Sequence, residues 1–155
     1  MNNLHVYLHD HLAGADLAVE LLDSLSKNQQ DEVTGDLAAG LLAEVKQDRD
    51  TLRSLADSVE SGSNIVKGVA AWMSEKALRV KFDPKSGDSF DSFQALEFLA
   101  LGVMGKLHLW RTLETAAQEP ATRAGLDLRQ LIVRAEDQYA RLEERRLELA
   151  AVALP

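Results

Sequence analysis

Apolar residues along this chain recur every three or four positions, which is the spacing that places them on one face of an α-helix. The alternating pattern of a half-buried strand is missing, and clusters of β-branched and aromatic residues are scarce. The clearest stripe steps by four and three residues and consists of Leu4, Leu8, His11, Ala15, Ala18, Leu22 and Leu25. The pattern therefore predicts an all-α protein.

The stripes are separated by polar stretches or by stretches that contain Gly and Pro, and these breaks divide the chain into helices. Four long helices are expected at about residues 3–27, 32–61, 89–118 and 127–152. A shorter amphipathic helix is expected at about 64–80, inside the connection between the second and third long helices. Four long helices of similar length, each spanning roughly 35–45 Å at about 1.5 Å per residue, are typical of a helix bundle.

The lengths of the connections predict the topology. The joins after the first and third long helices are short, so the helices within each of these two pairs should run antiparallel. The connection between helices 32–61 and 89–118 is long enough to travel the length of the bundle. We therefore expect one domain over residues 1–155, a four-helix bundle in the order up-down-down-up with a long crossover.

Three parts of the sequence carry a resemblance that points the same way. The fragments Tyr7–Gly14, Ala95–Gly102 with Gly105–Trp110, and Arg134–Gln138 are similar to those of small, functionally uncharacterised bacterial proteins of the ferritin-like superfamily. The resemblance covers nearly the whole chain and implies a ferritin-like bundle of two helical hairpins joined by one crossover. It implies no particular reaction.

The metal-binding members of that superfamily supply a Glu from each of two helices and a Glu-x-x-His from each of the other two. The two best matches here are Glu44-Val45-Lys46-Gln47 and Glu136-Asp137-Gln138-Tyr139, which have glutamine and tyrosine where an imidazole is required. We therefore expect no di-iron carboxylate centre of the usual composition, and no cofactor.

Several polar residues nevertheless interrupt the apolar stripes. They are His11, Glu44, Asp48, Glu97, Gln138 and either Arg145 or Arg146. Equal distances from the turn between the first two helices place His11 near the level of Asp48, with Glu44 one turn away, so we expect a hydrogen bond between the imidazole and a carboxylate inside the bundle. An arginine of the last helix is the expected counter-ion for Glu97, because its planar group of donors can satisfy both carboxylate oxygens.

These residues have two interpretations. They form a buried polar network that fixes the register of the helices, or His11, Glu44, Asp48 and Glu97 hold a single Fe, Mn or Zn ion in a reduced, atypical site. In the second case the protein is a metal-dependent oxidoreductase or a metal-handling protein. A third class is a small-molecule binding bundle, in which a cavity between the hairpins holds an apolar ligand.

Composition narrows the possible partners. The formal charge of -8 and pI of about 5.0 have the wrong sign for binding nucleic acid or an anionic membrane surface. No cysteine is present, which excludes disulfides and thiolate chemistry. No apolar run approaches the roughly 20 residues of a membrane span, and the first residues do not resemble a signal peptide. We expect a cytoplasmic protein.

The third long helix has more apolar surface than one neighbour can cover. Its apolar residues extend over more than half of the helix circumference. We therefore expect a homodimer through helix 89–118 and the crossover. The sequence as a whole favours a non-catalytic ferritin-like scaffold or interaction module over an enzyme.

Overall fold

The computed structural model describes residues 2–60 and 88–155, and these residues form helices and no strands. The prediction of an all-α protein is therefore confirmed over the described part of the chain. The expected crossover helix at 64–80 lies outside the described residues. The helices are α1 (Asn3–Ser26), α2 (Glu32–Glu60), α4 (Ser89–Ala116), α5 (Gln118–Arg123) and α6 (Leu128–Ala153).

Three helices begin at an Asn or Asp whose side chain accepts a hydrogen bond from a backbone amide of the first turn. Asn2 accepts from Leu4 N, and Asp88 accepts from Phe90 N. Asp127 accepts from Gln130 N, as its position at the start of the last apolar stripe indicates. These bonds satisfy amides that have no partner inside the helix, which explains why the helices begin where they do.

The connection between α4 and α6 contains a helix that the sequence pattern did not predict. The single turn and a half of α5 carries Pro120, which is tolerated near a helix start because the amide it lacks would have no partner there. Gly125 follows with φ of 78°, a left-handed conformation that costs glycine little. This compact turn brings α6 back along α4.

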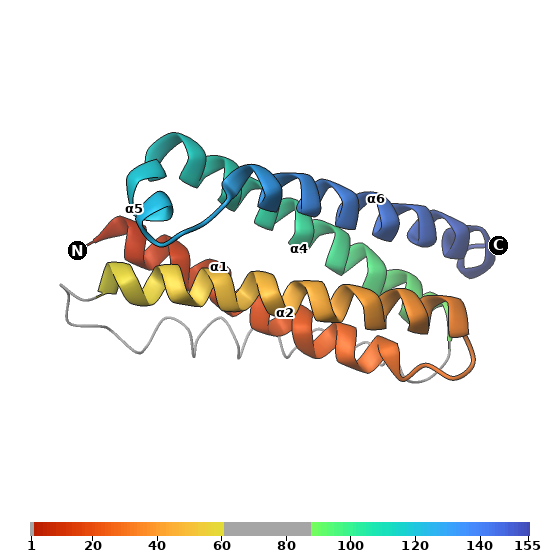
Figure 1. Cartoon of the computed structure of the whole chain (residues 1–155). Coiled ribbons are helices and arrows are strands. Elements are labelled where there is room, and N and C mark those ends of the chain that lie inside the picture. The colour runs from red at the N-terminus through yellow and green to blue at the C-terminus, as the bar shows by residue number, and fades with distance from the viewer. Residues whose placement is uncertain (1, 61–87) are drawn as a thin grey trace.

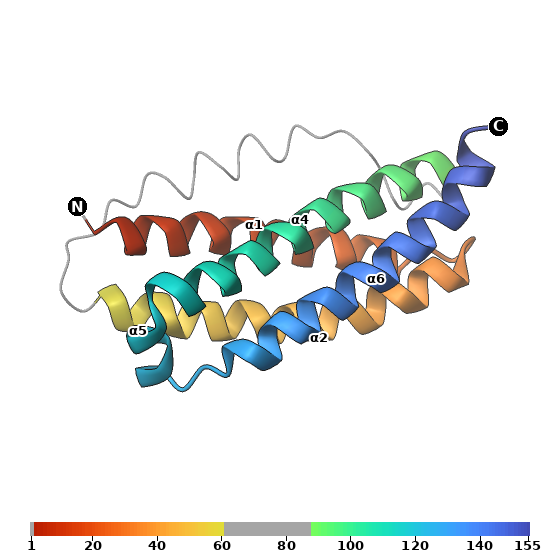
Figure 2. The ribbon, with the colours of Figure 1, turned by 90° about the horizontal axis from the view of Figure 1, so that it is seen from above.

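The described helices form two antiparallel hairpins, α1 with α2 and α4 with α6, and the second hairpin lies across the first (Figures 1 and 2). Packing within each hairpin is extensive. Between the hairpins, α1 approaches α4 more closely than α2 approaches α6. The two ends of the chain lie at opposite ends of the bundle (Figure 1).

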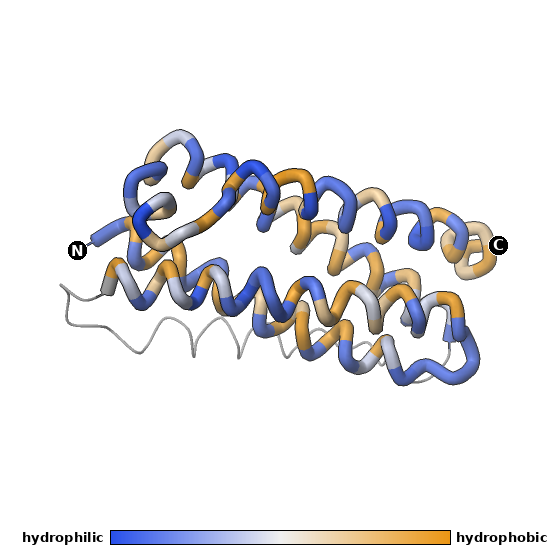
Figure 3. Tube along the Cα trace, viewed as in Figure 1, coloured by the Kyte–Doolittle hydropathy of each residue, from blue (hydrophilic) through white to orange (hydrophobic). Residues whose placement is uncertain are grey.

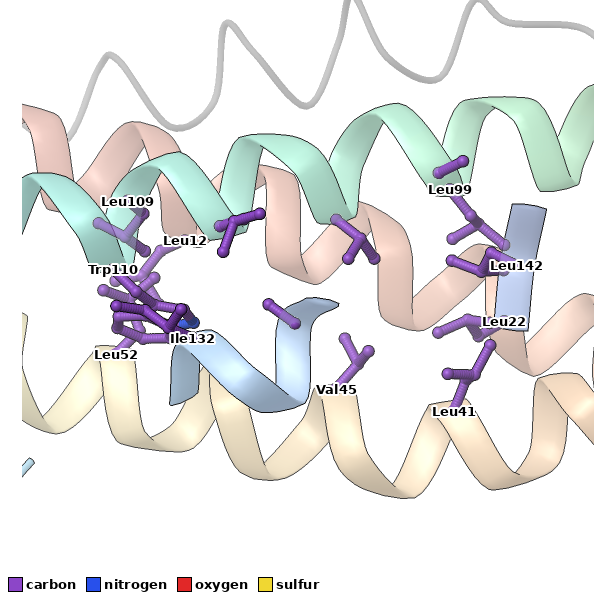
Figure 4. Packing of buried hydrophobic residues seen from close by; sticks show 14 of the residues in the cluster. Leu12, Leu22, Leu41, Val45, Leu52, Leu99, Leu109, Trp110, Ile132 and Leu142 are labelled. Carbon is purple, nitrogen blue, oxygen red and sulfur yellow. The ribbon is translucent and has the colours of Figure 1, made fainter. Parts of the chain in front are cut away.

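Buried hydrophobic residues from all five described helices form one core cluster, and the stretch that joins α1 to α2 is hydrophilic (Figure 3). Figure 4 shows that the labelled core residues, apart from Val45, gather in two groups along the bundle. One group contains Leu12, Leu52, Leu109, Trp110 and Ile132, and the other contains Leu22, Leu41, Leu99 and Leu142. Asp48, Lys106 and Gln138, which are described next, lie in sequence between members of these two groups.

Candidate functional site

A buried polar layer crosses the middle of the bundle and joins three helices. Asp48 of α2 is 4% exposed, and Gln138 of α6 is fully buried. Lys106 Nζ, from α4, donates to Asp48 Oδ2 at 2.6 Å and also to Gln138 Oε1. The amide of Gln138 donates to the same Asp48 oxygen at 3.2 Å. One buried carboxylate is therefore bound by an ammonium group and by an amide, each from a different helix.

The ammonium group of Lys106 pays a desolvation cost in this position. Burial lowers the pKa of Lys106 from its ordinary value, although the adjacent Asp48 carboxylate acts in the opposite direction. The Arg134 guanidinium lowers the Lys106 pKa further. The Lys106 ammonium group therefore loses hydration on burial and is stabilised in return by the Asp48 carboxylate. Without that contact, burying the charged lysine would be unfavourable.

Arginines of α6 extend the layer along α2. Arg134 Nε lies 3.5 Å from the second oxygen of Asp48, and the same side chain donates to the Glu44 carbonyl and to Gln47 Oε1 at 2.9 Å each. Two turns further along α6, Arg141 donates to both carboxylate oxygens of Glu44, at 2.9 and 2.7 Å. Glu44 is half-buried, and it faces α6.

A second polar cluster lies where the turn after α1 meets α6. Arg145 donates to both oxygens of Asp31 at 2.9 and 3.0 Å, and to Thr34 Oγ1 at 2.9 Å. Burial disfavours the Asp31 carboxylate, but the hydrogen bonds from Thr34 and Arg145 outweigh it and lower the pKa of Asp31. Asn28, in the same turn, donates to Ser92 Oγ of α4 at 3.3 Å. The cluster thus joins the turn to both helices of the other hairpin.

Glu97 does not lie at the inward position that we expected. Its side chain is 52% exposed, because it lies one residue beyond the buried Leu96 and therefore about 100° around the helix from it. The expected arginine is present: Arg146 donates to Glu97 at 3.1 Å. Arg146 also donates to both oxygens of Glu143, which lowers the pKa of Glu143 and raises that of Arg146.

His11 is half-buried and lines the same central cavity as Asp48 and Lys106. Burial lowers the pKa of His11, and the nearby His108 acts in the same direction while Asp10 opposes it. Its ring packs against Tyr7 in an edge-on arrangement, with ring centroids 4.7 Å apart. The hydrogen bond to Asp48 that we expected is not seen; Lys106 holds that carboxylate instead.

The polar residues that interrupt the stripes therefore do not form one network. Asp48 and Gln138 belong to the central layer, with Glu44 beside it, while Arg145 lies at the turn and the pair Glu97 and Arg146 lies elsewhere. Sequence reasoning missed Lys106. The signal was present, since Leu99, Val103, Lys106, Trp110 and Leu113 follow the steps of four and three residues that mark the buried seam of α4.

Arg134 and Arg141 were also missed. Both lie on α6 beside the buried stripe and reach across to α2 with long side chains, so their own positions in the pattern look like those of ordinary surface residues. The cationic and anionic side chains of the site pair with one another, as Lys106 does with Asp48 and Arg141 with Glu44. Over residues 2–60 and 88–155, no three His, Cys, Asp or Glu side chains are grouped so that they could hold a metal ion.

Comparisons with protein-family models, with curated proteins and with solved structures give no significant match to this chain. Within the described part of the chain, none of the helices combines the length and the apolar character needed to cross a membrane. The functional assignment therefore depends on the geometry described above.

Proposed function

We propose that this chain is a non-catalytic helical scaffold or interaction module of the ferritin-like type, with an up-down-down-up topology, no di-iron centre and no cofactor, working in the cytoplasm. The observation that supports this is the occupancy of Asp48. The most buried carboxylate of the inter-helix layer is bound by Lys106 and Gln138, with Arg134 beside its other oxygen. A metal ligand needs oxygen lone pairs directed at the ion, whereas Oδ2 of Asp48 accepts from two side chains and Oδ1 faces the positive charge of Arg134.

The half-buried carboxylates around the layer support the same proposal. Glu44 is paired with Arg141, and Asp31 is paired with Arg145. Ion pairs of this kind contribute modestly to stability, but they define which helix positions face one another. A scaffold needs such a defined arrangement and needs no reactive group.

Metal analysis of protein purified without a histidine tag tests this function. We expect less than a tenth of an equivalent of iron, manganese or zinc, and no rise in the thermal midpoint when any of these ions is added. The alternative, a metal-dependent oxidoreductase or metal-handling protein, is favoured only by the common position of His11 and Asp48 on the cavity. Near-stoichiometric metal that disappears in His11→Ala would establish that alternative and contradict the scaffold.

The proposal includes a homodimer that uses α4 and the crossover. Leu101 of α4 is 69% exposed and Phe90 is 40% exposed, so apolar surface remains on this helix after the bundle has formed. In sedimentation at micromolar concentration we expect a species near twice 17.0 kDa, and a shift toward the monomer in Leu101→Gln. A single species near 17.0 kDa for the unmodified chain would contradict the dimer.

A further inference from the structure

The central cavity opens to the surface between α1 and α4. Gly14 of α1 and Gly102 of α4 both line it, and both are exposed. A Cβ atom added to either glycine would meet no other atom of the described residues within 4 Å. Leu17 of α1 and Phe98 of α4 line the same opening. These four residues form an open apolar surface, the α1–α4 groove.

The α1–α4 groove has a form that another helix can fill. On α1, Gly14 is followed by Leu17 and Leu21 at helical spacing, and on α4 Phe98 is followed by Gly102. Because the glycines carry no side chain, a third helix can approach both backbones between the larger residues. A groove of this kind typically binds the apolar face of an amphipathic helix.

The other contact between the hairpins is already filled by polar side chains. Arg134 of α6 donates to Gln47 of α2, and Arg141 donates to Glu44. An apolar helix face laid over these groups would remove them from water without offering hydrogen bonds in return. The α1–α4 groove is therefore the better seat for such a face.

The connection between α2 and α4 has to travel the length of the bundle. α2 ends where α1 begins, whereas α4 begins at the opposite end (Figures 1 and 2). At about 1.5 Å per residue, the 28 residues of α4 span roughly 42 Å. The helix expected over 64–80 would cover roughly 25 Å of this length. The remaining residues of 61–87 are able to bridge the rest, since an extended chain covers about 3.3 Å per residue.

The sequence of this connection matches the groove in its apolar pattern. Its larger apolar residues recur at helical spacing and would form one side of a helix: Ile65, Val69, Trp72 and Met73. Trp72 lies near the middle of the connection, as Gly14 and Gly102 lie near the middle of α1 and α4. Laid along the groove, the largest side chain of the connection would reach the level at which the walls are smallest.

Charge distinguishes this connection from a second copy of the chain. Residues 61–87 contain five Lys or Arg and two Asp or Glu, a net charge of +3, whereas the whole chain has -8. α1 carries four carboxylates and no Lys or Arg, and one of them, Asp10, lies one turn before Gly14. A basic segment is attracted to this side of the bundle, whereas a second copy is repelled by its own acidic charge.

We propose that the α1–α4 groove is the docking site for residues 64–80 of the same chain, which bind in it as an amphipathic helix. Trp72 and Met73 face the groove, and the basic side chains of the helix lie near the carboxylates of α1. This inference goes beyond the scaffold function, because it gives the groove an occupant from within the chain. A homodimer then has to use surface outside the groove, such as that around Leu101.

The chain has no cysteine, so two introduced cysteines report on one contact. In the intact chain, Met73→Cys with Gly102→Cys should form an intramolecular disulfide on oxidation at micromolar concentration, read by nonreducing electrophoresis and peptide mapping. Val69→Cys and Lys76→Cys, about one turn to either side, cover an error in register. The control replaces Gly102→Cys by Gly40→Cys, at an exposed glycine of α2, and should react at least about tenfold more slowly.

A further cysteine tests which side of the segment faces the groove. Ala71→Cys lies two residues from Met73, about 200° around a helix, and should react with Gly102→Cys at least about tenfold more slowly than Met73→Cys does.

A second measurement needs no disulfide. Gly102→Leu places a large side chain in the groove, so quenching of Trp72 fluorescence by acrylamide should rise severalfold while the helical circular dichroism is retained. Gly40→Leu makes the same change outside the groove and should leave the quenching unchanged. Trp110 is 1% exposed and should contribute little to either value.

The outcomes that overturn the proposal are distinct. Equal rates with Gly102→Cys and Gly40→Cys, or with Met73→Cys and Ala71→Cys, would show that the segment does not bind the groove by this side. Covalent dimers as the main product would assign the groove to a second copy. Absence of a disulfide at all three positions of the segment, with unchanged quenching in Gly102→Leu, would place the segment elsewhere. None of these results bears on the absence of a metal centre, which metal analysis tests separately.

Discussion

The two contacts between the hairpins, α2 with α6 and α1 with α4, are filled by different kinds of side chain. Where α6 faces α2, the helices stand further apart and long arginines bridge them to carboxylates, as Arg141 does to Glu44. Where α1 faces α4, the helices come closer and small residues such as Ala18 and Gly102 leave an apolar cavity. Helix separation therefore determines which side chains can fill a seam, and a seam filled by small residues retains unoccupied volume.

The largest effect is expected from Lys106→Met, because it leaves Asp48 buried without its ammonium partner. The variant should lose about 3–5 kcal/mol of the free energy of unfolding in urea. Lys46→Met, at an exposed position of α2, is the matched control and should change that free energy by less than about 0.5 kcal/mol. Equal effects of the two substitutions would show that the Asp48 carboxylate does not depend on Lys106.

A smaller loss is expected at the turn. Arg145→Met removes the bonds to Asp31 and Thr34, and the Arg145 side chain is only 18% exposed, so the free energy of unfolding should fall by about 1.5–3 kcal/mol. Arg53→Met is the control, since Arg53 is 48% exposed and pairs with Asp16 at the surface, where such pairs contribute about 0–1 kcal/mol. A loss at Arg145 no greater than that at Arg53 would contradict a structural role for the cluster.

On the opposite seam a substitution should stabilise the protein. Ala18→Leu adds apolar volume where the cavity is empty of side chains, and we expect a gain of about 0.5–2 kcal/mol in the free energy of unfolding. Ala39→Leu makes the same change at an exposed position of α2 and is the control for the change in the free energy of unfolding. If Ala18→Leu is destabilising relative to Ala39→Leu, the walls around α1 are packed too tightly for the additional side chain.

The smallest effect is a dependence on pH. The unfolded chain protonates His11 near its ordinary pKa of 6.5, whereas burial lowers the pKa of His11 in the folded state. At a pH between the folded-state and unfolded-state pKa of His11, the unfolded chain binds more protons than the folded chain. The free energy of unfolding should therefore fall as the pH decreases below 6.5. His11→Gln should reduce this slope in denaturation curves measured across that range. An unchanged slope would mean that burial does not hold the imidazole neutral.

Much of the fold could be predicted because helix periodicity and capping are local signals. The bounds of the four long helices differ from the expected ones by no more than two residues. The short helix α5 was missed because six residues carry too little periodicity to be distinguished from a turn. Pro120 and Gly125 indicated only that a connection lies between the third and fourth long helices, and not that it contains a helix.

The candidate site was harder to predict, because the partner of a buried charge depends on the relative placement of helices. Asp48 and Gln138 stand out as polar residues on apolar stripes, and both are buried. Glu97 was assigned inward although it lies one position from the seam that contains Lys106. The partners of Glu44 and Asp31 come from α6, about a hundred residues away, and no pattern within either helix specifies them.

The chain ends at opposite ends of the bundle have a mechanical consequence (Figure 1). Tension applied between them would act along the helix axes and would shear α1 and α6 past the helices that they contact. The hairpins would then resist together and not open one contact at a time. In such a geometry the bonds that Gln138 and Lys106 make across the bundle would be loaded in parallel.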